Sequence, residues 1–419
     1  MNSLNITPEK LAQSINSEIT INAWVYKIRK ASGLYFVALR YRKYCFQSVY
    51  IPDLCKTPLN EMCEGAYIEA VASVKEEKRS PYGFELTLKS FRTLSRPIEA
   101  YPLNVSQPTL GSTLEDSIKN RNVSLRHPSE FDIISIRGDI EFAFSQFMQM
   151  NDFVKVNTPK INKACSVTDY INAQYFEHKA SLAHSPVLHL IQAVGGLDCV
   201  YETGVGYSAK NRNSLRHLNE FTRLDFELSY ANRETVIEIL NNAIDYILCY
   251  IKKNRKRELE SLGVKINKPS SISVISYKTA MDITEKPYTQ KSLDPTDEKK
   301  LCEYAKSEYE SNYIFITDIP KENRPFCEKD GCGFVLLSNG LEIASGGEHI
   351  SDYTKQHKKI SDFGLSPDDY ESFLSAHKYG LPPLAGAGIG LERFVMALLG
   401  LDNIRRATLF TRDLHHLVP

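Results

Sequence analysis

The run GAGIGLERF, residues 386–394, is the most informative stretch of this sequence. Gly386, Gly388 and Gly390 alternate with small or apolar residues, and glycine lets a backbone come very close to a flat partner. Glu392 and Arg393 follow directly, so two charges stand beside the glycines. A strand packed closely on a helix would need the same glycines, so the run alone leaves a purely structural role open.

The overall composition is that of an ordinary globular protein. The chain has 419 residues, of which 42% are hydrophobic and 24% charged, and this length predicts two or three domains. Lysine plus arginine and aspartate plus glutamate both number 51, so net charge gives no general attraction to nucleic acid or to a membrane. Any RNA contact must therefore be local.

Cysteine usage and the first residues predict a cytoplasmic protein without a membrane partner. The nine cysteines include no CxxC pair, and no histidine cluster completes a zinc site, so reduced thiols are expected. The opening MNSLNITPEK lacks the pattern of a signal peptide, and no apolar run is long enough to span a bilayer.

The N-terminal part of the chain predicts a small β-barrel. The β-rich runs INAWVYKI, LYFVALR, CFQSVYI, AYIEAVASV and FELTLKSF follow one another between residues 19 and 94. That strand count fits an OB-fold, whose open face commonly binds oligonucleotides. Prolines then accumulate in RPIEAYPLNVSQPTLGS, which favours extended chain. We therefore predict an OB-fold at 1–98, a linker at 99–125 and a catalytic domain at 126–419.

The C-terminal part predicts an α+β domain built around an antiparallel sheet. Ile136, Ile140, Phe144 and Phe147 recur at helical spacing, and the strand-like run FVKVNTP follows them. Further strands are expected at CVYETGVGY, LDFELSY, YIFITD, GFVLLS and LEIASGG, with a helix over residues 235–252 and a solvated helix end and loop over 253–268.

Three more segments accompany the glycine run: RHLNEFTRLDFE at 216–227, GLEIASGG at 340–347 and LDNIRRATLFTRD at 401–413. Together the four resemble class II aminoacyl-tRNA synthetases. The glycine run looks like motif 3, residues 201–230 look like motif 2, and residues 136–159 look like motif 1. The chain is most similar to aspartyl-tRNA synthetases of the archaeal and eukaryotic type, as a divergent paralogue, and the resemblance covers nearly its whole length.

The resemblance implies an antiparallel sheet that holds ATP in a bent form, and a homodimer through motif 1. Arg393 matches the arginine along the triphosphate, His217 a γ-phosphate contact and Phe221 the ring that stacks on adenine. Glu342 and Ser345 match oxygen ligands of Mg²⁺. Arg216 falls in the implied ATP site, and the implied amino-acid pocket contains Ser185, Val187, Leu190, Asp225, Ser345, Gly346, His349 and Gly388. Among these, Asp225 would hold the α-ammonium group.

The barrel also carries residues that match the family's anticodon readers. Phe36 would stack on a base and Gln47 would bind a base edge. For a phenylalanine and a glutamine taken alone, a core aromatic beside a surface amide is the more ordinary explanation. The basic residues Lys27, Arg29, Lys30, Arg40, Arg42 and Lys43 could follow the phosphate backbone of a tRNA of the Asp or Asn type, or be a solvated surface.

The sequence departs from the family where the chemistry is expected. The motif 2 arginine, which would bridge the amino-acid carboxylate and the α-phosphate, is Ser208. Losing one such donor typically costs on the order of 10² to 10³ in rate. Lys210 could replace it in part, if a strand continues and places both residues on one face. An aspartate that would bind Mg²⁺ is Val335, which leaves one carboxylate and predicts weakened metal binding.

The amino-acid pocket departs from the family as well. The lysine and the arginine that would hold an aspartate side chain are Leu190 and His349. A buried carboxylate without a cationic partner is expensive, so aspartate should fit poorly. The segment Cys165–Gln174 is also shorter than the family's substrate-covering loop and lacks its glutamate.

Three functions remain open from the sequence. The first is an ATP-dependent ligase that adenylates a different, less acidic amino acid and passes it to tRNA or to another acceptor. The second is a pseudo-synthetase that keeps the fold, the dimer and nucleotide or tRNA binding but has lost activation. The third is an ordinary aspartate–tRNA ligase.

Overall fold

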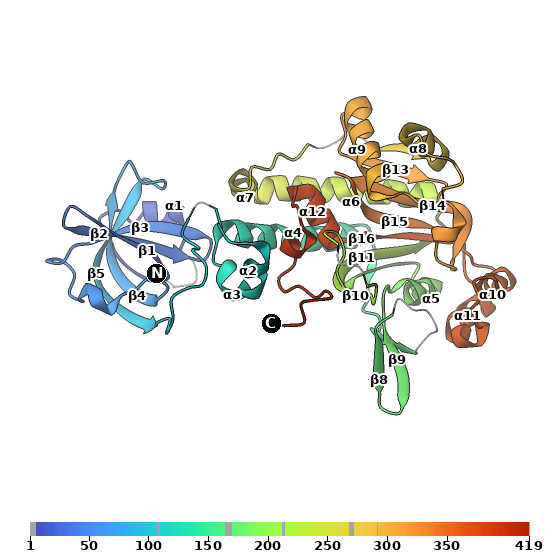
Figure 1. Ribbon diagram of the computed structural model, residues 1–419, viewed down its shortest axis with the longest axis horizontal. Helices are drawn as coiled ribbons and strands as arrows, with labels where there is room; N and C mark the ends of the chain where they lie inside the picture. The colour runs from blue at the N-terminus through green and yellow to red at the C-terminus, as the bar shows by residue number, and fades with distance from the viewer. Residues whose placement is uncertain are drawn as a thin grey trace. The chain divides into compact units, whose positions relative to one another are not determined.

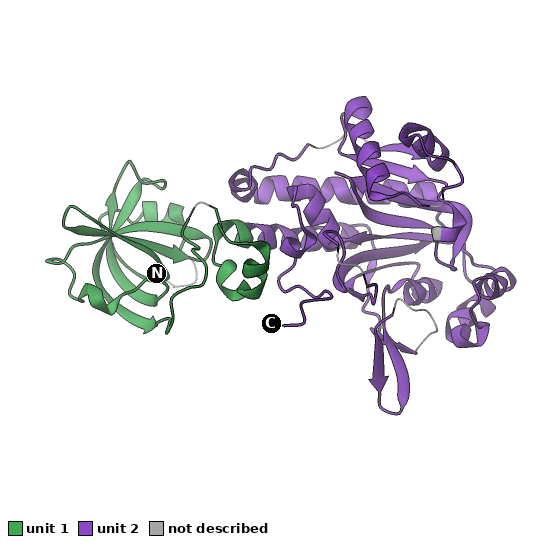
Figure 2. Ribbon diagram, in the orientation of Figure 1, with its two compact units in different colours: residues 1–131 green, residues 132–419 purple. Residues whose placement is uncertain are grey.

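The computed structural model describes residues 6–107, 109–163, 170–211, 214–267, 272–290 and 292–418. The chain divides into two compact units, Met1–Phe131 and Asp132–Pro419 (Figure 2). Each unit has a hydrophobic core of its own. Among the described residues, no helix has the length and apolar character needed to cross a membrane.

The N-terminal unit contains a closed barrel with the strand order β1-β2-β3-β5-β4 (Figure 1). Its elements are α1 (Pro8–Ala12), β1 (Glu18–Ala31), β2 (Leu34–Tyr41), β3 (Tyr44–Tyr50), η1 (Leu59–Glu61), β4 (Tyr67–Glu76) and β5 (Phe84–Ser95). Alternate residues of each strand point inward, as in β4, where Ile68, Ala70, Ala72 and Val74 are buried. The predicted OB-fold is confirmed.

The segment predicted as a linker, residues 99–125, instead belongs to the N-terminal unit. Leu103 and Val105 form an apolar cluster with Val123, and Tyr26 of β1 packs against it. Two short helices follow, α2 (Leu114–Lys119) and α3 (Arg121–Ser124). The prolines of this segment suggest a free connection, but its few apolar residues are enough to bury it against the barrel.

The second unit is built on an eight-stranded sheet, in the order β12-β13-β14-β15-β16-β11-β10-β6. Neighbouring strands are antiparallel except at the two edges, where β12 and β13, and β10 and β6, are parallel. The strands are β6 (Val154–Lys155), β10 (Cys199–Tyr207), β11 (Glu220–Ser229), β12 (Ser273–Ser276), β13 (Tyr313–Thr317), β14 (Glu328–Ser338), β15 (Leu341–His349) and β16 (Leu384–Gly390). The predicted α+β class is confirmed, although the run FVKVNTP contributes only two residues to the sheet.

Helices cover both faces of this sheet (Figure 1). On one face, α4 (Pro128–Met150), α6 (Arg233–Asn254) and α12 (Leu391–Leu399) share a large core with the central strands. On the other, α8 (Tyr277–Thr284) and α9 (Pro295–Tyr309) pack on β13 and β14, while α5 (Val187–Leu197), α10 (Tyr353–Asp362) and α11 (Glu371–Lys378) form a third cluster. The remaining short elements are α7 (Lys256–Ser261), η2 (Lys321–Asn323), η3 (Pro367–Tyr370) and η4 (Ile404–Ala407).

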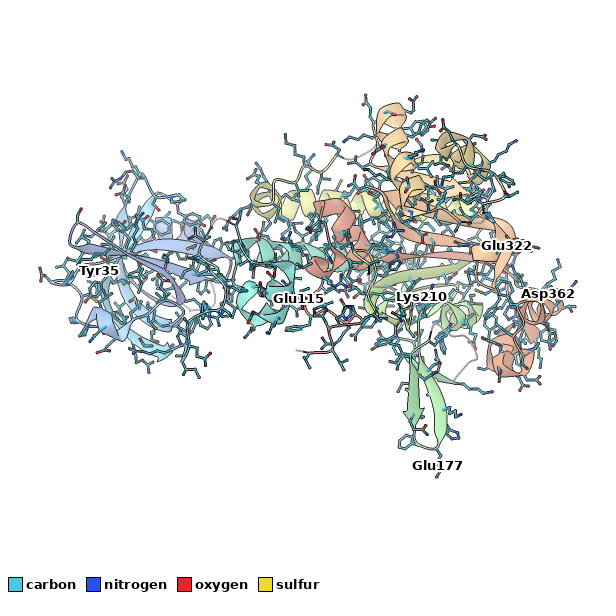
Figure 3. All side chains as sticks on the ribbon, viewed as in Figure 1. Tyr35, Glu115, Glu177, Lys210, Glu322 and Asp362 are labelled. Atoms are coloured by element: carbon cyan, nitrogen blue, oxygen red, sulfur yellow. The ribbon has the colours of Figure 1, made fainter. Side chains whose placement is uncertain are left out.

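A small three-stranded sheet, β7-β9-β8, projects from the second unit. It consists of β7 (Ile161–Lys163), β8 (Asn172–Tyr175) and β9 (His178–Leu182), and Glu177 lies at the tip of the β8–β9 hairpin (Figure 3). The predicted short substrate-covering segment, Cys165–Gln174, lies outside the described residues over 165–169.

The glycine-rich run forms the end of β16 and the first turn of α12. A Cβ atom on Gly386 would lie 2.3 Å from the carbonyl oxygen of Phe226, and one on Gly346 would lie 2.4 Å from that of Gly386. Strands β11, β16 and β15 therefore approach too closely for side chains here. Close packing of the strands therefore explains Gly386 and Gly346, whether or not these glycines also have a functional role.

Glu392, in the same run, joins three elements. Its carboxylate accepts a hydrogen bond from Arg137 of α4 at 3.0 Å and one from the backbone N–H of Thr222 in β11 at 2.9 Å. Arg137 also donates to the Thr222 hydroxyl at 2.7 Å. Since Glu392 is buried, these bonds hold the start of α12 firmly against both α4 and β11.

Candidate active site

A cavity of about 720 Å³ opens on the face of the sheet formed by β11, β15 and β16. Helix α5, the start of β14 and the α11 region complete its walls. Of the predicted site residues, the cavity brings together Ser185, Val187, Asp225, Glu342, Ser345, Gly346, His349 and Gly388. The glycines of β15 and β16 form its floor, so backbone is exposed where other residues would place side chains.

Strand β11 provides a row of functional side chains along one face. Phe221, Arg223, Asp225 and Glu227 alternate with residues of the opposite face, and the last three line the cavity. The ring of Phe221 lies over Gly206 of β10, whose Cβ atom would meet it at 2.9 Å. It also contacts the ring of His184, at 5.5 Å between centroids. Phe221 is partly buried against the core and does not line the cavity, so its stacking on adenine stays a prediction.

Arg223 and Asp225 form a bidentate pair, with Nη2–Oδ1 at 2.6 Å and Nε–Oδ2 at 2.9 Å. Burial acts to lower the pKa of Arg223, but the adjacent carboxylate, chiefly that of Asp225, raises it overall. Arg223 therefore stays charged, and Asp225, the predicted ammonium ligand, already has a cationic partner.

Glu227 and His349 form a second buried pair, with Nε2 3.0 Å from the carboxylate. Burial raises the pKa of Glu227, against the opposing effect of His349. Burial would lower the pKa of His349, but the carboxylate of Glu227 and hydrogen bonding raise it well above its ordinary value. The contact with Glu227 therefore favours the protonated form of His349.

Arg324 and Glu328 form a third pair at the start of β14. The guanidinium binds the carboxylate through Nε at 2.7 Å and donates to the carbonyl oxygen of Gly346 at 2.8 Å. Both side chains are buried. Three cation–carboxylate pairs therefore surround the part of the cavity where an amino-acid side chain would lie.

The predicted phosphate-binding residues lie at the other end of the site. Arg393 donates to the backbone carbonyl oxygens of Arg216 at 3.3 Å and Glu342 at 3.1 Å. Arg216 is held by Glu298 of α9 at 2.8 Å, and His217 lies 2.6 Å from the Ser214 hydroxyl. Arg393, Arg216 and Glu342 are thus gathered together, as the resemblance implied.

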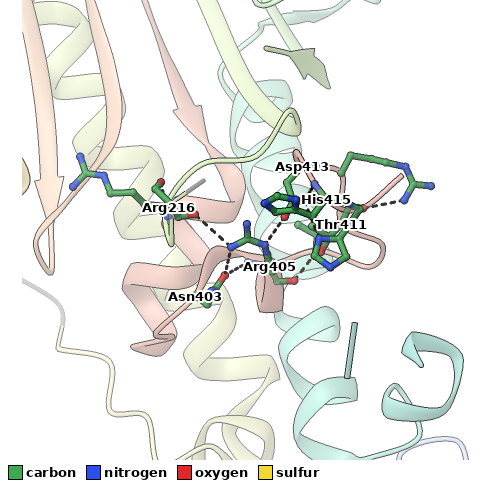
Figure 4. Close-up of polar contacts among 10 residues, drawn as sticks. Arg216, Asn403, Arg405, Thr411, Asp413 and His415 are labelled. Atoms are coloured by element: carbon green, nitrogen blue, oxygen red, sulfur yellow. Dashed lines mark hydrogen bonds and ion pairs between the residues drawn. The ribbon is translucent and has the colours of Figure 1, made fainter. Parts of the chain in front are cut away.

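The C-terminal segment holds the motif 2 loop in place (Figure 4). The backbone N–H of Ile404 donates to the carbonyl oxygen of Leu215, and that of Asn219 donates to the carbonyl oxygen of Arg412, both at 2.9 Å. Arg405 donates to Asp413 at 2.5 Å. Burial would raise the pKa of Asp413, but hydrogen bonds from His415, His416 and Arg405 lower it to about 2. The 401–413 segment therefore supports the site without entering the cavity.

Two sequence interpretations need correction. Lys210 does not continue a strand, because β10 ends at Tyr207 and the chain turns, with Asn219 binding the carbonyl oxygens of Ser208 at 2.6 Å and Lys210 at 3.3 Å. The argument that placed Lys210 on the face of Ser208 therefore fails, and Lys210 lies beyond the end of the strand (Figure 3).

The second correction concerns Leu190. It is fully buried in the apolar cluster between α5 and α11, with Ile191 and Phe373, and does not line the cavity. The α5 residues that do face the cavity include His189 and Gln192. Burial and the nearby charge of Lys160 lower the pKa of His189, so this histidine is neutral at pH 7.

The two predicted metal ligands supply one carboxylate and one hydroxyl. Glu342 and Ser345 lie on β15, and Val335 pairs with Ser345 across the β14–β15 ladder. Over the described ranges, no group of three or more histidine, cysteine or acidic side chains forms a metal cluster. The carboxylate of Glu342 and the Ser345 hydroxyl are hard oxygen donors and fit Mg²⁺ bound mainly by nucleotide phosphates and water.

In the barrel, Phe36 and Gln47 project from one face. Ala38 pairs with Gln47 between β2 and β3, and Phe36 lies two residues from Ala38, so both side chains point the same way. The guanidinium of Arg29 lies 5.5 Å from the centre of the Phe36 ring, and Gln47 donates to Glu85 at 2.7 Å. This geometry suits a base stacked on Phe36 with its edge toward Gln47.

Sequence reasoning missed Arg223, Glu227 and Arg324. The first two could have been found, because polar residues at every second position of a strand that is otherwise apolar mark a functional face. Arg324 could not have been found in this way, because it lies between η2 and β14 and belongs to no alternating strand.

The Glu227–His349 pair predicts a pH dependence of stability. The pair contributes fully to the free energy of unfolding below the ordinary histidine pKa of about 6.5. This contribution is lost as the pH rises through the raised pKa of His349 in the folded protein, because the carboxylate of Glu227 then has no cationic partner. We expect the free energy of unfolding from urea titrations to fall above neutral pH. The variant His349→Gln should flatten this decline, and equal slopes for both proteins would contradict the assignment.

Comparison with known proteins agrees with this geometry. The second unit has the fold of class II aminoacyl-tRNA synthetases: asparaginyl-tRNA synthetase from Pyrococcus horikoshii, complexed with asparaginyl-adenylate, matches with a TM-score of 0.89 at 22% identity over 97% of each chain. Aspartyl-tRNA synthetase from Entamoeba histolytica matches with a TM-score of 0.86 at 23% identity, over 99% of this chain and 92% of that one.

Sequence comparison gives the family. The model for class II tRNA synthetases (D, K and N) matches residues 113–414. The aspartate–tRNA(Asp/Asn) ligase of Methanocaldococcus jannaschii is 34% identical over 100% of this chain and 97% of its own length. The aspartate–tRNA(Asp) ligase of Pyrococcus furiosus is 30% identical over 98% of both. The chain belongs to the aspartyl-tRNA synthetase family.

Proposed function

We propose that this protein is an ATP-dependent ligase that activates an amino acid with an uncharged side chain and transfers it to a tRNA. The ligase class rests on the relatives, which are named as aspartate–tRNA ligases with Asp or Asp/Asn specificity. The substrate rests on one observation: in the described lining of the cavity, every lysine and arginine has a carboxylate partner, in the pairs Lys163–Asp369, Arg223–Asp225 and Arg324–Glu328.

A carboxylate in the substrate side chain would find no buried cation without a partner among these pairs. Binding it would require breaking one of the two buried pairs or burying an extra negative charge, and both are costly, whereas the Lys163–Asp369 pair is exposed to solvent. His349, which replaces the family's arginine, is engaged with Glu227, and His189 is neutral. An amide or another neutral polar side chain can bind the same groups through hydrogen bonds without adding charge.

The site residues suggest how ATP and Mg²⁺ would be held. Phe221 would stack on adenine, Arg393, Arg216 and His217 would bind phosphate oxygens, and Glu342 with Ser345 would face the metal. Mg²⁺ bound there would neutralise phosphate charge as pyrophosphate leaves. With Val335 in place of an aspartate, only one carboxylate contributes, so we expect a higher Mg²⁺ requirement than in relatives that have two.

The test is ATP–pyrophosphate exchange screened across the standard amino acids. Exchange with an uncharged amino acid, and at least about tenfold less with aspartate, would support the proposal. Exchange with aspartate alone would contradict the inference that the pocket excludes a charged side chain. It would indicate an ordinary aspartate–tRNA ligase.

A pseudo-synthetase is the second candidate, favoured by Ser208 and Val335, which replace a catalytic arginine and a metal ligand. It predicts binding of ATP and tRNA but no exchange with any amino acid. The same screen therefore separates the candidates, provided that ATP binding is measured on the same preparation.

We expect the barrel to bind tRNA through Phe36 and Gln47. The double variant Phe36→Ala, Gln47→Ala in the full chain should weaken tRNA binding about tenfold or more, because loss of one base stack costs about 1–3 kcal/mol. Filter binding at fixed salt measures this. Tyr230→Ala, an exposed aromatic of the second unit, serves as the control, and an equal loss there would contradict the assignment.

We also expect a homodimer through the α4 region. Phe142 and Met150 of α4 are 54% and 66% exposed, and Val154 of the adjoining strand is also exposed, which is unusual for apolar residues on a monomer surface. Phe142→Asp should shift the protein to a monomer in sedimentation measurements. Tyr379→Asp, at a more exposed aromatic residue just after α11, should leave the dimer intact.

A further inference from the structure

Arg223 stands at the junction between the two halves of the site. Along β11 it lies between Phe221, the expected adenine platform, and Asp225, the expected ammonium ligand. In the neighbouring strand β16 it pairs with Gly390, and Asp225 pairs with Gly388. An amino-acid carboxylate attacking the α-phosphate of a bound nucleotide must lie between these same two points.

The guanidinium points into the cavity over the glycine floor. A Cβ atom placed on Gly388 would lie 2.5 Å from Nη2 of Arg223 and 2.1 Å from Oδ1 of Asp225. Toward the phosphate end, the carboxylate of Glu342 acts electrostatically on both Arg223 and Arg393. Arg223 is therefore near the ammonium ligand on one side and the phosphate-binding group on the other.

Ser208, which replaces the motif 2 arginine, lies on the same face of the sheet as Arg223. Gly206 and Gly204 of β10 pair with Phe221 and Arg223, and the backbone N–H of Ser208 binds the carbonyl oxygen of Asn219 at 2.9 Å. Positions 204, 206 and 208 thus share the face of Arg223, and two of them carry no side chain. An arginine at 208 and one at 223 would lie on this face on either side of Phe221, whose ring covers Gly206.

From this geometry we propose that Arg223 is a catalytic residue that takes over the task of the motif 2 arginine replaced by Ser208. The inference rests on the proposed amino-acid activation. The pair with Asp225 uses Nε and Nη2 of Arg223 and leaves Nη1 for a further anion, while the ammonium group of a bound amino acid shares the Asp225 carboxylate. Arg223 then binds the substrate carboxylate and the α-phosphate, for which its planar, permanently charged fork is suited.

In the reaction, a carboxylate oxygen forms a bond to the α-phosphorus and the bond to the bridging oxygen of pyrophosphate breaks. The products are an aminoacyl-adenylate and pyrophosphate, and no proton has to be transferred. Arg223 lowers the barrier by neutralising negative charge where two anions approach each other.

The test compares Arg223→Gln, Ser208→Arg and the double variant with the wild type. Two readouts are used: exchange with the amino acid found in the screen, and binding of AMP and of adenosine measured by NMR titration. Arg223→Gln should lower the exchange rate about 10²- to 10³-fold. It should weaken AMP binding about tenfold and leave adenosine binding within about twofold, because only AMP carries the α-phosphate. Ser208→Arg in the Arg223→Gln background should recover at least about tenfold in exchange.

Unchanged AMP affinity in Arg223→Gln would overturn the proposal, and so would full exchange activity in that variant. If the wild type shows no exchange with any amino acid, the proposed function fails, but the AMP-against-adenosine comparison still tests the phosphate contact of Arg223. Retained adenosine binding reports that the site is folded. Arg223→Lys, which keeps a cation beside Asp225, is the second variant, and it should bind AMP more weakly than the wild type because it lacks the fork.

Discussion

Replacing Arg324 with alanine is expected to lower the free energy of unfolding by about 3–5 kcal/mol, because it leaves the carboxylate of Glu328 buried without a partner. The pair is fully enclosed at the start of β14, with side-chain exposures of 9% and 2%. Arg324 also donates to the carbonyl oxygen of Gly346, so the substitution loosens the floor of the cavity. Chemical denaturation monitored by circular dichroism measures the change.

A surface pair provides the matched control. Lys256 and Glu260 of α7 lie 3.9 Å apart, and both are well exposed. Lys256→Ala should change the free energy of unfolding by less than about 1 kcal/mol, because solvent screens such pairs. Equal effects of Lys256→Ala and Arg324→Ala would show that burial of the Arg324–Glu328 pair does not matter.

Gly388→Val should abolish amino-acid activation while leaving the protein folded. The first carbon of the new side chain would lie within 2.5 Å of both Asp225 and Arg223, and both belong to movable side chains rather than to backbone. These two side chains would be pushed out of place, and misplacement by about 1 Å can cost 10²-fold in rate. We expect the exchange rate to fall by at least about that factor.

Gly390→Ala, two residues further along β16, is the control for this substitution. Its added carbon would have no neighbour closer than 3.9 Å, so activity and stability should stay close to those of the wild type. A large loss in Gly390→Ala would show that the glycine run responds to any added side chain, and the effect at Gly388 would then say nothing about Asp225 and Arg223.

Much of the fold could be predicted because it is encoded locally. Barrel strands such as β4 have period-two alternation, α4 has helical spacing, and β16 with α12 carries the glycine run. What could not be predicted depends on contacts between distant residues. Whether residues 99–125 are free or packed depends on Leu103 meeting Val123, and whether Leu190 faces the cavity depends on Phe373 of α11.

The candidate site was likewise predictable where local sequence patterns mark its residues, and not where it depends on contacts between side chains. Asp225, Glu342 and His349 could be assigned to motif positions because the strands that carry them were recognised, and all three line the cavity, while their roles there stay predictions. Two pairs were not predicted: Glu227 and His349 lie far apart in the sequence, and Arg324 and Glu328, although only four residues apart, stand in no helix or strand pattern that marks them. Lys210 was misplaced because the end of β10 is set by the turn that Asn219 closes, and turn residues give weaker sequence signals than strands.

The bonds of Glu392 have a consequence for a dimer assembled through α4. Arg137 of that helix, Glu392 and Thr222 form one rigid connection from the surface helix to the strand that carries Phe221 and Arg223. A nucleotide that shifts β11 must then also shift α4, and the affinity between subunits changes by the same factor as the affinity for the nucleotide. If the proposed dimer forms through α4, we expect ligand occupancy and subunit association to be cooperative, with the two sites coupled through Glu392.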